Sequence, residues 1–198
     1  MVSSAFKPAV NRVIEPIARL AIRAKFTPNA VTLIGTVGTI LSALYFYPRG
    51  DLFIGTLFIS FFALSDLFDG AIARLSEAGA SAWGGFLDST CDRLTDSAIL
   101  GGVAIYCILL DITIYPVVIA SIVMGFLVPY IRAKAESFGI ACTVGIAERT
   151  ERVILALTGI GLDGLGLPYV LTISMWLLLL LGTVTVAQRI VVVRKGLI

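Results

Sequence analysis

Four aspartates at the ends of two apolar segments are the residues of this chain best suited to chemistry. Asp66 and Asp69 close one segment, and Asp88 and Asp92 lie near the start of the next. Carboxylates at the edge of such segments are costly unless something compensates their charge, so a functional site is the first interpretation. Hard divalent cations such as Mg²⁺ bind oxygen ligands and share them with substrate phosphates. The four acids therefore predict a metal site.

Helical spacing places these acids in two rows, because residues three, four, seven and eight apart share one face of a helix. The first row holds Asp66, Asp69, Gly70, Ala73 and Arg74, and the second holds Gly84, Asp88, Asp92 and Asp96. Two facing rows could hold two metal ions, the arrangement that stabilises the attacking and leaving oxygens of a phosphoryl displacement. Arg74 is placed to contact a phosphate.

Two alternative roles for the acids stay open. The acids could form ion pairs with Arg74 and Arg93, although four acids and two arginines leave negative charge that such pairs do not neutralise. They could instead line a transit path for metal ions, monovalent ions or protons in a transporter. Acids of that kind are expected in the middle of a membrane, whereas these lie near one edge.

The absence of histidine narrows the acid–base chemistry. The chain contains no His, which excludes a His base, a His metal ligand and a Ser-His-Asp triad. A general base must then be a carboxylate, Lys, Tyr or Cys, and the two rows supply carboxylates. The cysteines Cys91, Cys107 and Cys142 show no paired spacing, and we expect them to be reduced, small apolar residues.

The composition is that of a membrane protein. Hydrophobic residues make up 58% of the chain, charged residues 14%, and the mean hydropathy is +0.99. Apolar stretches cover about 29–47, 52–73, 86–110, 112–130, 153–165 and 169–193. All but the fifth reach the ~20 residues that a membrane-spanning helix needs. We therefore expect an all-α integral membrane fold with six transmembrane helices.

The basic residues predict how this bundle is oriented. In a six-span arrangement every Lys and Arg except Arg49 falls on one side. The positive-inside rule makes that side cytoplasmic, with both termini there. In residues 1–26 apolar residues recur at helical spacing and mostly basic residues occupy the other face, which predicts an amphipathic helix lying on the membrane surface. The alternative is a soluble cap packed on the bundle. Residues 27–198 then form the six-helix domain.

The two rows resemble a family signature: Asp66-x-x-Asp69-Gly70-x-x-Ala73-Arg74, then Gly84-x-x-x-Asp88-x-x-x-Asp92. It is that of the CDP-alcohol phosphotransferases, six-helix membrane enzymes that transfer a phosphatidyl or similar group from a CDP-linked donor to an alcohol and release CMP. The resemblance implies that Asp66, Asp69 and Asp88 bind one metal ion and that Asp66, Asp88 and Asp92 surround a second. Mg²⁺ is expected, with Mn²⁺ as an alternative. Asp92 would be the catalytic base. The resemblance also implies a homodimer in the cell membrane.

The same resemblance implies a nucleotide pocket for the donor. Its members would be Asn29, Thr32, Asp69, Gly70, Arg74 and Ser81. The flanking residues could also have ordinary structural roles. Thr27-Pro28-Asn29 is a good helix start, with a polar cap and proline in the first turn. Ser81 could be a plain loop serine.

Basic residues in the second half of the chain indicate an anionic acceptor. Arg132 and Lys134 end the fourth span, and Arg149 and Arg152 open the fifth. All four could bind the acceptor's phosphate, although some could be ordinary positive-inside residues. The segments 130–136, with Gly139, and 148–152 resemble the actinobacterial phosphatidylinositol phosphate synthases, which join CDP-diacylglycerol to inositol 1-phosphate. The tail around Gln188-Arg189 also resembles them. The phosphatidylglycerol phosphate synthases, which use glycerol 3-phosphate, share much of this pattern and remain the alternative.

Overall fold

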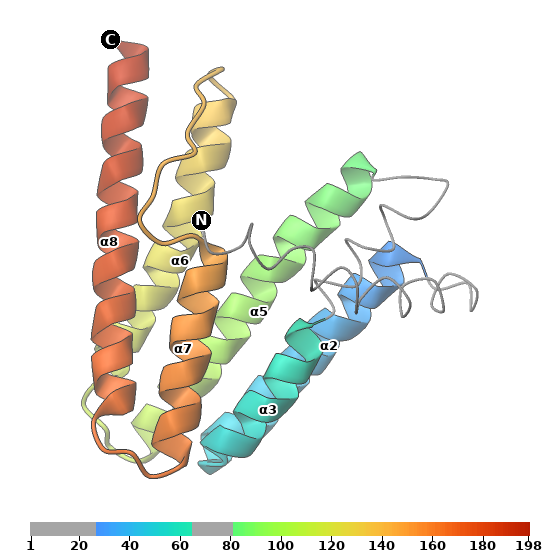
Figure 1. Ribbon diagram of the computed structural model, residues 1–198, viewed down its shortest axis with the longest axis vertical. Helices are drawn as coiled ribbons and strands as arrows, with labels where there is room; N and C mark the ends of the chain where they lie inside the picture. Colours follow the sequence, from blue (N-terminus) through green and yellow to red (C-terminus); the bar gives the residue numbers. More distant parts are fainter. Residues whose placement is uncertain (1–26, 65–80) are drawn as a thin grey trace, which may run out of the picture. The chain divides into compact units, whose positions relative to one another are not determined.

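The computed structural model describes residues 27–64 and 81–198, and the regular elements within these ranges are helices (Figure 1). They are α2 (Pro28–Phe46), the short 3-10 helix η1 (Tyr47–Arg49), α3 (Leu52–Ala63), α5 (Ala82–Leu109), α6 (Tyr115–Glu136), α7 (Arg149–Gly164) and α8 (Val170–Leu197). The all-α prediction is confirmed over these ranges. The predicted helix at 1–26 lies outside the described residues, as do Asp66, Asp69, Gly70 and Arg74.

The described residues divide into two compact units, 27–41 with 58–64 and 81–95, and 42–57 with 96–198. In the first unit α2 and α3 lie so close together that a Cβ atom on Gly38 would overlap the ring of Phe62. Between these two helices Gly50, at φ +83°, ends η1 and lets the chain turn into α3. The prediction of one domain over 27–198 stays a prediction.

In the second unit α6 and α7 each pack against α8 (Figure 1). Glycines make these approaches possible. A Cβ atom on Gly159 of α7 would overlap the side chain of Ser174 on α8, and one on Gly182 of α8 would lie 3.0 Å from Met124 Cβ on α6. Small residues at helix contacts are the usual way in which membrane helices come close enough for van der Waals packing.

The helices have the length and surface of membrane segments. Pro28–Arg49, Tyr115–Glu136 and Val170–Leu197 are each long and apolar enough to cross a membrane. Large apolar side chains face outward from α2, α3 and α8, for example Phe61 at 68% exposed, Leu41 at 64% and Ile173 at 64%. Such exposure suits a lipid environment rather than water. The protein is therefore a membrane protein.

The remaining helices depart from simple spans. α3 has 12 residues and ends next to residue 64, where the first described range stops. α7 has 16 residues. α7 begins at Arg149, so the charges of Arg149, Glu151 and Arg152 lie within its first turn. α5 is long, at 28 residues, but its first half carries Asp88, Asp92, Arg93 and Asp96. Three of the six predicted spans are thus supported by length and composition among the described residues.

Candidate functional site

The start of α5 is fixed by a serine cap. The Ser81 Oγ accepts a hydrogen bond from the Gly84 amide at 2.9 Å, which satisfies one of the unpaired amides of the first turn. Ser81 is therefore more than a loop residue: it sets where the helix that carries Asp88 and Asp92 begins. Its predicted contact with the nucleotide stays a prediction.

Gly84 lies where the starts of α2 and α5 come close together. A Cβ atom on Gly84 would lie 3.1 Å from Ser81 Oγ and 3.3 Å from Asn29 Oδ1. The structure thus brings together two residues predicted to bind nucleotide, Asn29 and Ser81, around a glycine of the family signature. A side chain here would lie tightly against both polar groups, whereas glycine leaves room beside the backbone.

The start of α2 is confirmed as a good helix start. Thr27 Oγ1 accepts a hydrogen bond from the Ala30 amide at 3.2 Å, and Pro28 is the first helical residue. Thr32 is buried, and its hydroxyl donates to the Pro28 carbonyl at 3.1 Å. Its predicted nucleotide contact is untested, and the observed bond is an ordinary one within the helix.

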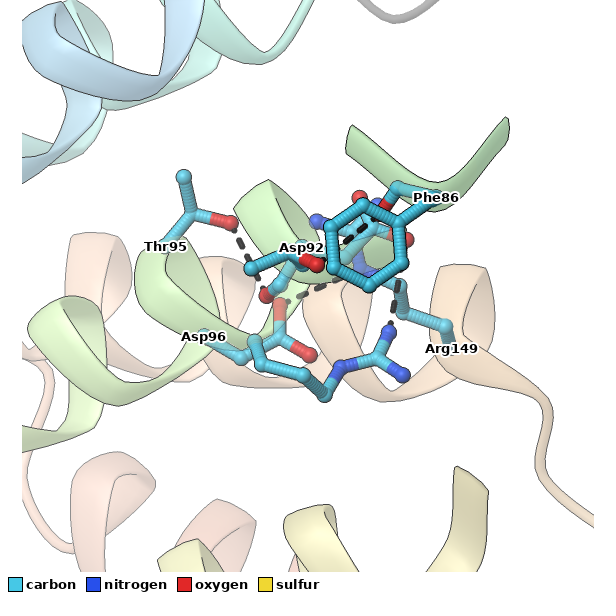
Figure 2. A network of polar contacts seen from close by, with 7 residues as sticks. Phe86, Asp92, Thr95, Asp96 and Arg149 are labelled. Carbon is cyan, nitrogen blue, oxygen red and sulfur yellow. Dashed lines mark hydrogen bonds and ion pairs between the residues drawn. The ribbon is translucent and has the colours of Figure 1, made fainter. Parts of the chain in front are cut away.

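Asp88 and Asp92 lie one turn apart on α5. Asp88 is exposed, whereas the Asp92 side chain is 17% exposed and its Oδ2 lies 3.3 Å from Arg93 Nη2. In Figure 2 the Thr95 hydroxyl donates to the Asp92 carbonyl, at 3.1 Å. Two carboxylates on one stripe of a helix suit a hard divalent cation, which prefers oxygen ligands. They are half of the predicted four-acid set.

The other half lies outside the described residues. Within 27–64 and 81–198, no group of three or more Asp, Glu, Cys or His residues is gathered closely enough to hold a metal ion. Asp66 and Asp69 would have to supply the remaining ligands, and Gly70 and Arg74 the remaining donor contacts. All of these assignments stay predictions.

The two basic residues of α7 lie in a partly buried polar group. Arg149 Nε donates to Asp96 Oδ1 of α5 at 3.2 Å (Figure 2). Arg152 is 7% exposed, and its Nη1 donates to the Ala147 carbonyl at 3.3 Å, just before the helix. The geometry therefore restrains both guanidinium groups, which are spaced by three residues and share a face of α7.

The two basic residues of α6 make local contacts instead. Arg132 Nε lies 2.9 Å from Glu136 Oε1, with both side chains about half exposed. Lys134 Nζ lies 4.6 Å from the centre of the Phe138 ring, a cation–π contact. The predicted phosphate-binding set thus consists of a restrained pair on α7 and an accessible pair at the end of α6. Binding of the acceptor by the four together stays a prediction.

Arg189 on α8 belongs to the tail that resembles the synthases, and the structure shows it as a polar anchor, a role that the sequence did not predict. It is 6% exposed, and its Nε donates to the Val144 carbonyl at 3.0 Å. Its Nη1 donates to the Val128 carbonyl of α6. The residue therefore ties α8 to α6 and to the segment between α6 and α7. The available signal was a lone arginine within an apolar helix, which rarely lacks a buried partner.

Comparison with known proteins identifies the family of this chain. Residues 25–195 match the family model of CDP-alcohol phosphatidyltransferase. The chain belongs to this family. It is therefore an enzyme of the CDP-alcohol phosphotransferase class, as the signature in the two acidic rows predicted.

Individual relatives of this phosphatidyltransferase are similar over most of their length. The phosphatidylinositol phosphate synthase of Streptomyces avermitilis is 40% identical over 198 residues, covering 93% of this chain and 79% of that protein. The crystal structure of the Mycobacterium tuberculosis phosphatidylinositol phosphate synthase with CDP-DAG bound is similar at a TM-score of 0.86 and 36% identity, covering 92% of this chain and 94% of that one. The same enzyme in complex with manganese and citrate gives 0.84 and 38%, covering 91% and 88%.

Proposed function

We propose that this enzyme transfers the phosphatidyl group of CDP-diacylglycerol to inositol 1-phosphate, giving phosphatidylinositol phosphate and CMP. The observation that carries the proposal is the extensive similarity to phosphatidylinositol phosphate synthases, one of them solved with CDP-DAG. The family signature supports the donor chemistry, and the basic residues of α6 and α7 support an anionic acceptor.

The acidic rows are proposed to bind two divalent cations, with Mg²⁺ as the first choice. The carboxylate chemistry of Asp88 and Asp92 fits such ions, and a related enzyme has been solved with manganese. Bound there, such ions would supply positive charge for the donor's diphosphate and for the oxygens of the displacement. Asp66 and Asp69 would complete the ligand set.

The chain's own residues would carry out the transfer as follows. Asn29, Thr32, Asp69, Gly70, Arg74 and Ser81 would hold the cytidine diphosphate part of the donor. Asp92 would accept the proton of the acceptor hydroxyl. The hydroxyl oxygen then forms a bond to the phosphorus next to diacylglycerol, and the bond from that phosphorus to the CMP oxygen breaks. Arg74 would balance the negative charge that develops on the departing CMP.

The acceptor's phosphate is proposed to bind Arg132, Lys134, Arg149 and Arg152. The restrained pair on α7 would fix the position of the phosphate, because a planar guanidinium can bind it with two parallel hydrogen bonds. The accessible pair on α6 would attract the anion as it approaches.

The membrane arrangement is also a proposal. We expect six transmembrane helices in the cell membrane, an N-terminal interfacial helix over 1–26, and both termini and the active site on the cytoplasmic side. The distribution of Lys and Arg supports this orientation. We also expect a homodimer; among the described residues nothing lies within 4 Å of a Cβ atom on Gly101, and such small residues permit close helix contact.

A direct assay tests the proposal. The purified protein, in detergent with CDP-diacylglycerol and Mg²⁺, would be given inositol 1-phosphate, glycerol 3-phosphate or unphosphorylated inositol, and lipid products and CMP would be measured. Formation of phosphatidylinositol phosphate with stoichiometric CMP is the expected result. A lipid product only with glycerol 3-phosphate would replace the acceptor. No CMP release with any acceptor would reject transferase function and bring back transport of metal ions or other ions.

A further inference from the structure

The acidic row of α5 continues one turn beyond the family signature, to Asp96. Asp92 and Asp96 are four residues apart, so they share a face of the helix. In the structure the Asp96 carboxylate accepts a hydrogen bond from Arg149, 53 positions further along the chain. Figure 2 shows the two side chains meeting between α5 and α7. The third acid of the row therefore joins two helices.

This ion pair is shielded from water more than an ordinary surface pair. The side chains of Arg149 and Asp96 are 28% and 20% exposed, whereas those of Arg132 and Glu136 are 51% and 53% exposed. Exposed pairs contribute little, because solvent screens them and both side chains lose freedom. The Asp96–Arg149 pair, which is about half as exposed and spans two helices, restrains the arginine more strongly.

The atom used in this bond matters for what Arg149 can do. Asp96 binds the Nε atom at 3.2 Å. A guanidinium has five N–H donors in one rigid plane, so fixing the Nε direction fixes the direction of the Nη donors too. A phosphate needs those Nη donors for two parallel hydrogen bonds. Asp96 thus sets the orientation of the fork that an anionic acceptor would meet.

Asp96 and the second arginine of the pair also line the same cavity. Asp96 and Arg152 both line a small cavity of about 40 Å³ in the second unit, together with Ser121. Two guanidinium groups on one helical turn repel each other, and a carboxylate beside them reduces that repulsion. Asp96 therefore contributes negative charge to the cavity that Arg152 lines, in addition to its bond with Arg149.

We propose that Asp96 is a positioning residue for the acceptor: it holds Arg149 in the orientation that binds the acceptor's phosphate. This inference rests on the proposed function and adds a specificity-determining residue to it. Asp96 acts through the guanidinium and does not touch the reacting atoms. A simple tie between α5 and α7 would affect stability, but it would not act selectively on the KM for the acceptor.

The test compares Asp96→Asn and Asp96→Glu with Asp111→Asn in the purified full-length enzyme. Asp111 is exposed beyond the other end of α5 and is the matched control. Asp96→Asn should raise the KM for inositol 1-phosphate about tenfold, the scale of a lost charged hydrogen bond. It should leave kcat and the KM for CDP-diacylglycerol nearly unchanged. Asp96→Glu should restore most of the acceptor affinity, and Asp111→Asn should behave as the wild type.

A double-mutant cycle separates positioning from plain structural support. In an Arg149→Gln background, Asp96→Asn should change the acceptor KM by less than about twofold, because the two residues act through one contact. Fully additive effects, an equal rise in the donor KM, or an unchanged acceptor KM would each overturn the proposal. If Asp96→Asn does not fold, Arg149→Lys keeps the charge but lacks the planar fork. An unchanged acceptor KM in that variant would also overturn it.

The wild-type acceptor assay keeps this test apart from the test of the proposed function. Turnover with glycerol 3-phosphate alone would reject inositol phosphate as the substrate, and the cycle would then be run with glycerol 3-phosphate. Turnover with unphosphorylated inositol alone would overturn both ideas, because no phosphate would be left for Arg149 to bind.

Discussion

Replacing Arg189 with methionine is expected to destabilise the protein markedly. The guanidinium is 6% exposed and donates to two carbonyls, that of Val144 before α7 and that of Val128 on α6. A hydrogen bond from a charged donor contributes ~1.5–3 kcal/mol, so the two together give ~3–6 kcal/mol. Methionine fills similar space and removes a buried charge, which recovers part of this. We expect a net loss of about 3 kcal/mol, near the lower end of that range.

Thermal unfolding in detergent measures this loss. For a chain of this size 1 kcal/mol corresponds to ~2–4 °C, so Arg189→Met should lower Tm by roughly 6–12 °C. Arg194→Met is the matched control, because Arg194 is exposed five residues further along the same helix. Its Tm should stay near that of the wild type. Equal Tm values for the two variants would refute the view that Arg189 anchors α8.

Four further predictions concern the site and the packing. Chelation should abolish turnover and added Mg²⁺ should restore it; activity that survives chelation would exclude the metal site. Asp92→Asn should slow the chemical step by ~10²–10⁴ in single-turnover kinetics, as expected for loss of a general base. A wild-type rate for this step would mean that another group accepts the proton of the acceptor hydroxyl. Arg152→Gln should raise the acceptor KM roughly ten- to a hundredfold, whereas Arg74→Gln should weaken binding of the donor. If both variants weakened only donor binding, Arg152 would belong to the nucleotide pocket. Gly159→Val should lower Tm more than Gly125→Val, since only Gly159 of the two has a close neighbour among the described residues; similar losses would contradict the packing.

Features that depend on local spacing could be predicted from the sequence. The start of α2 at Pro28 follows from a threonine cap and a proline in the first turn, and both are observed. The placement of Asp88, Asp92 and Asp96 on one face follows from helical periodicity alone. The all-α membrane class follows from composition, and the family from the signature.

Features that depend on tertiary packing could not be predicted in this way. Periodicity places Asp96 on the acidic row, but it does not say that α7 brings Arg149 against it. Arg132, Lys134, Arg149 and Arg152 were predicted as one set, because all four follow or precede spans on the same predicted side. The structure shows local partners for the first two and long-range or buried contacts for the last two. Those differences are set by how the helices pack.

The length of α5 has a consequence for how a lipid reaches the acids. Its 28 residues, at ~1.5 Å each, make a helix of about 42 Å, whereas the hydrocarbon core of a bilayer is ~30 Å thick. In the proposed membrane arrangement, with Leu109 at one edge of that core and little tilt, Asp88 would lie ~31 Å away, at the opposite edge, and Asp92 about one turn inside. The phosphates of a lipid lie close to this depth. In that arrangement the proposed lipid donor would present its diphosphate to the acidic row while its acyl chains stay among those of its neighbours.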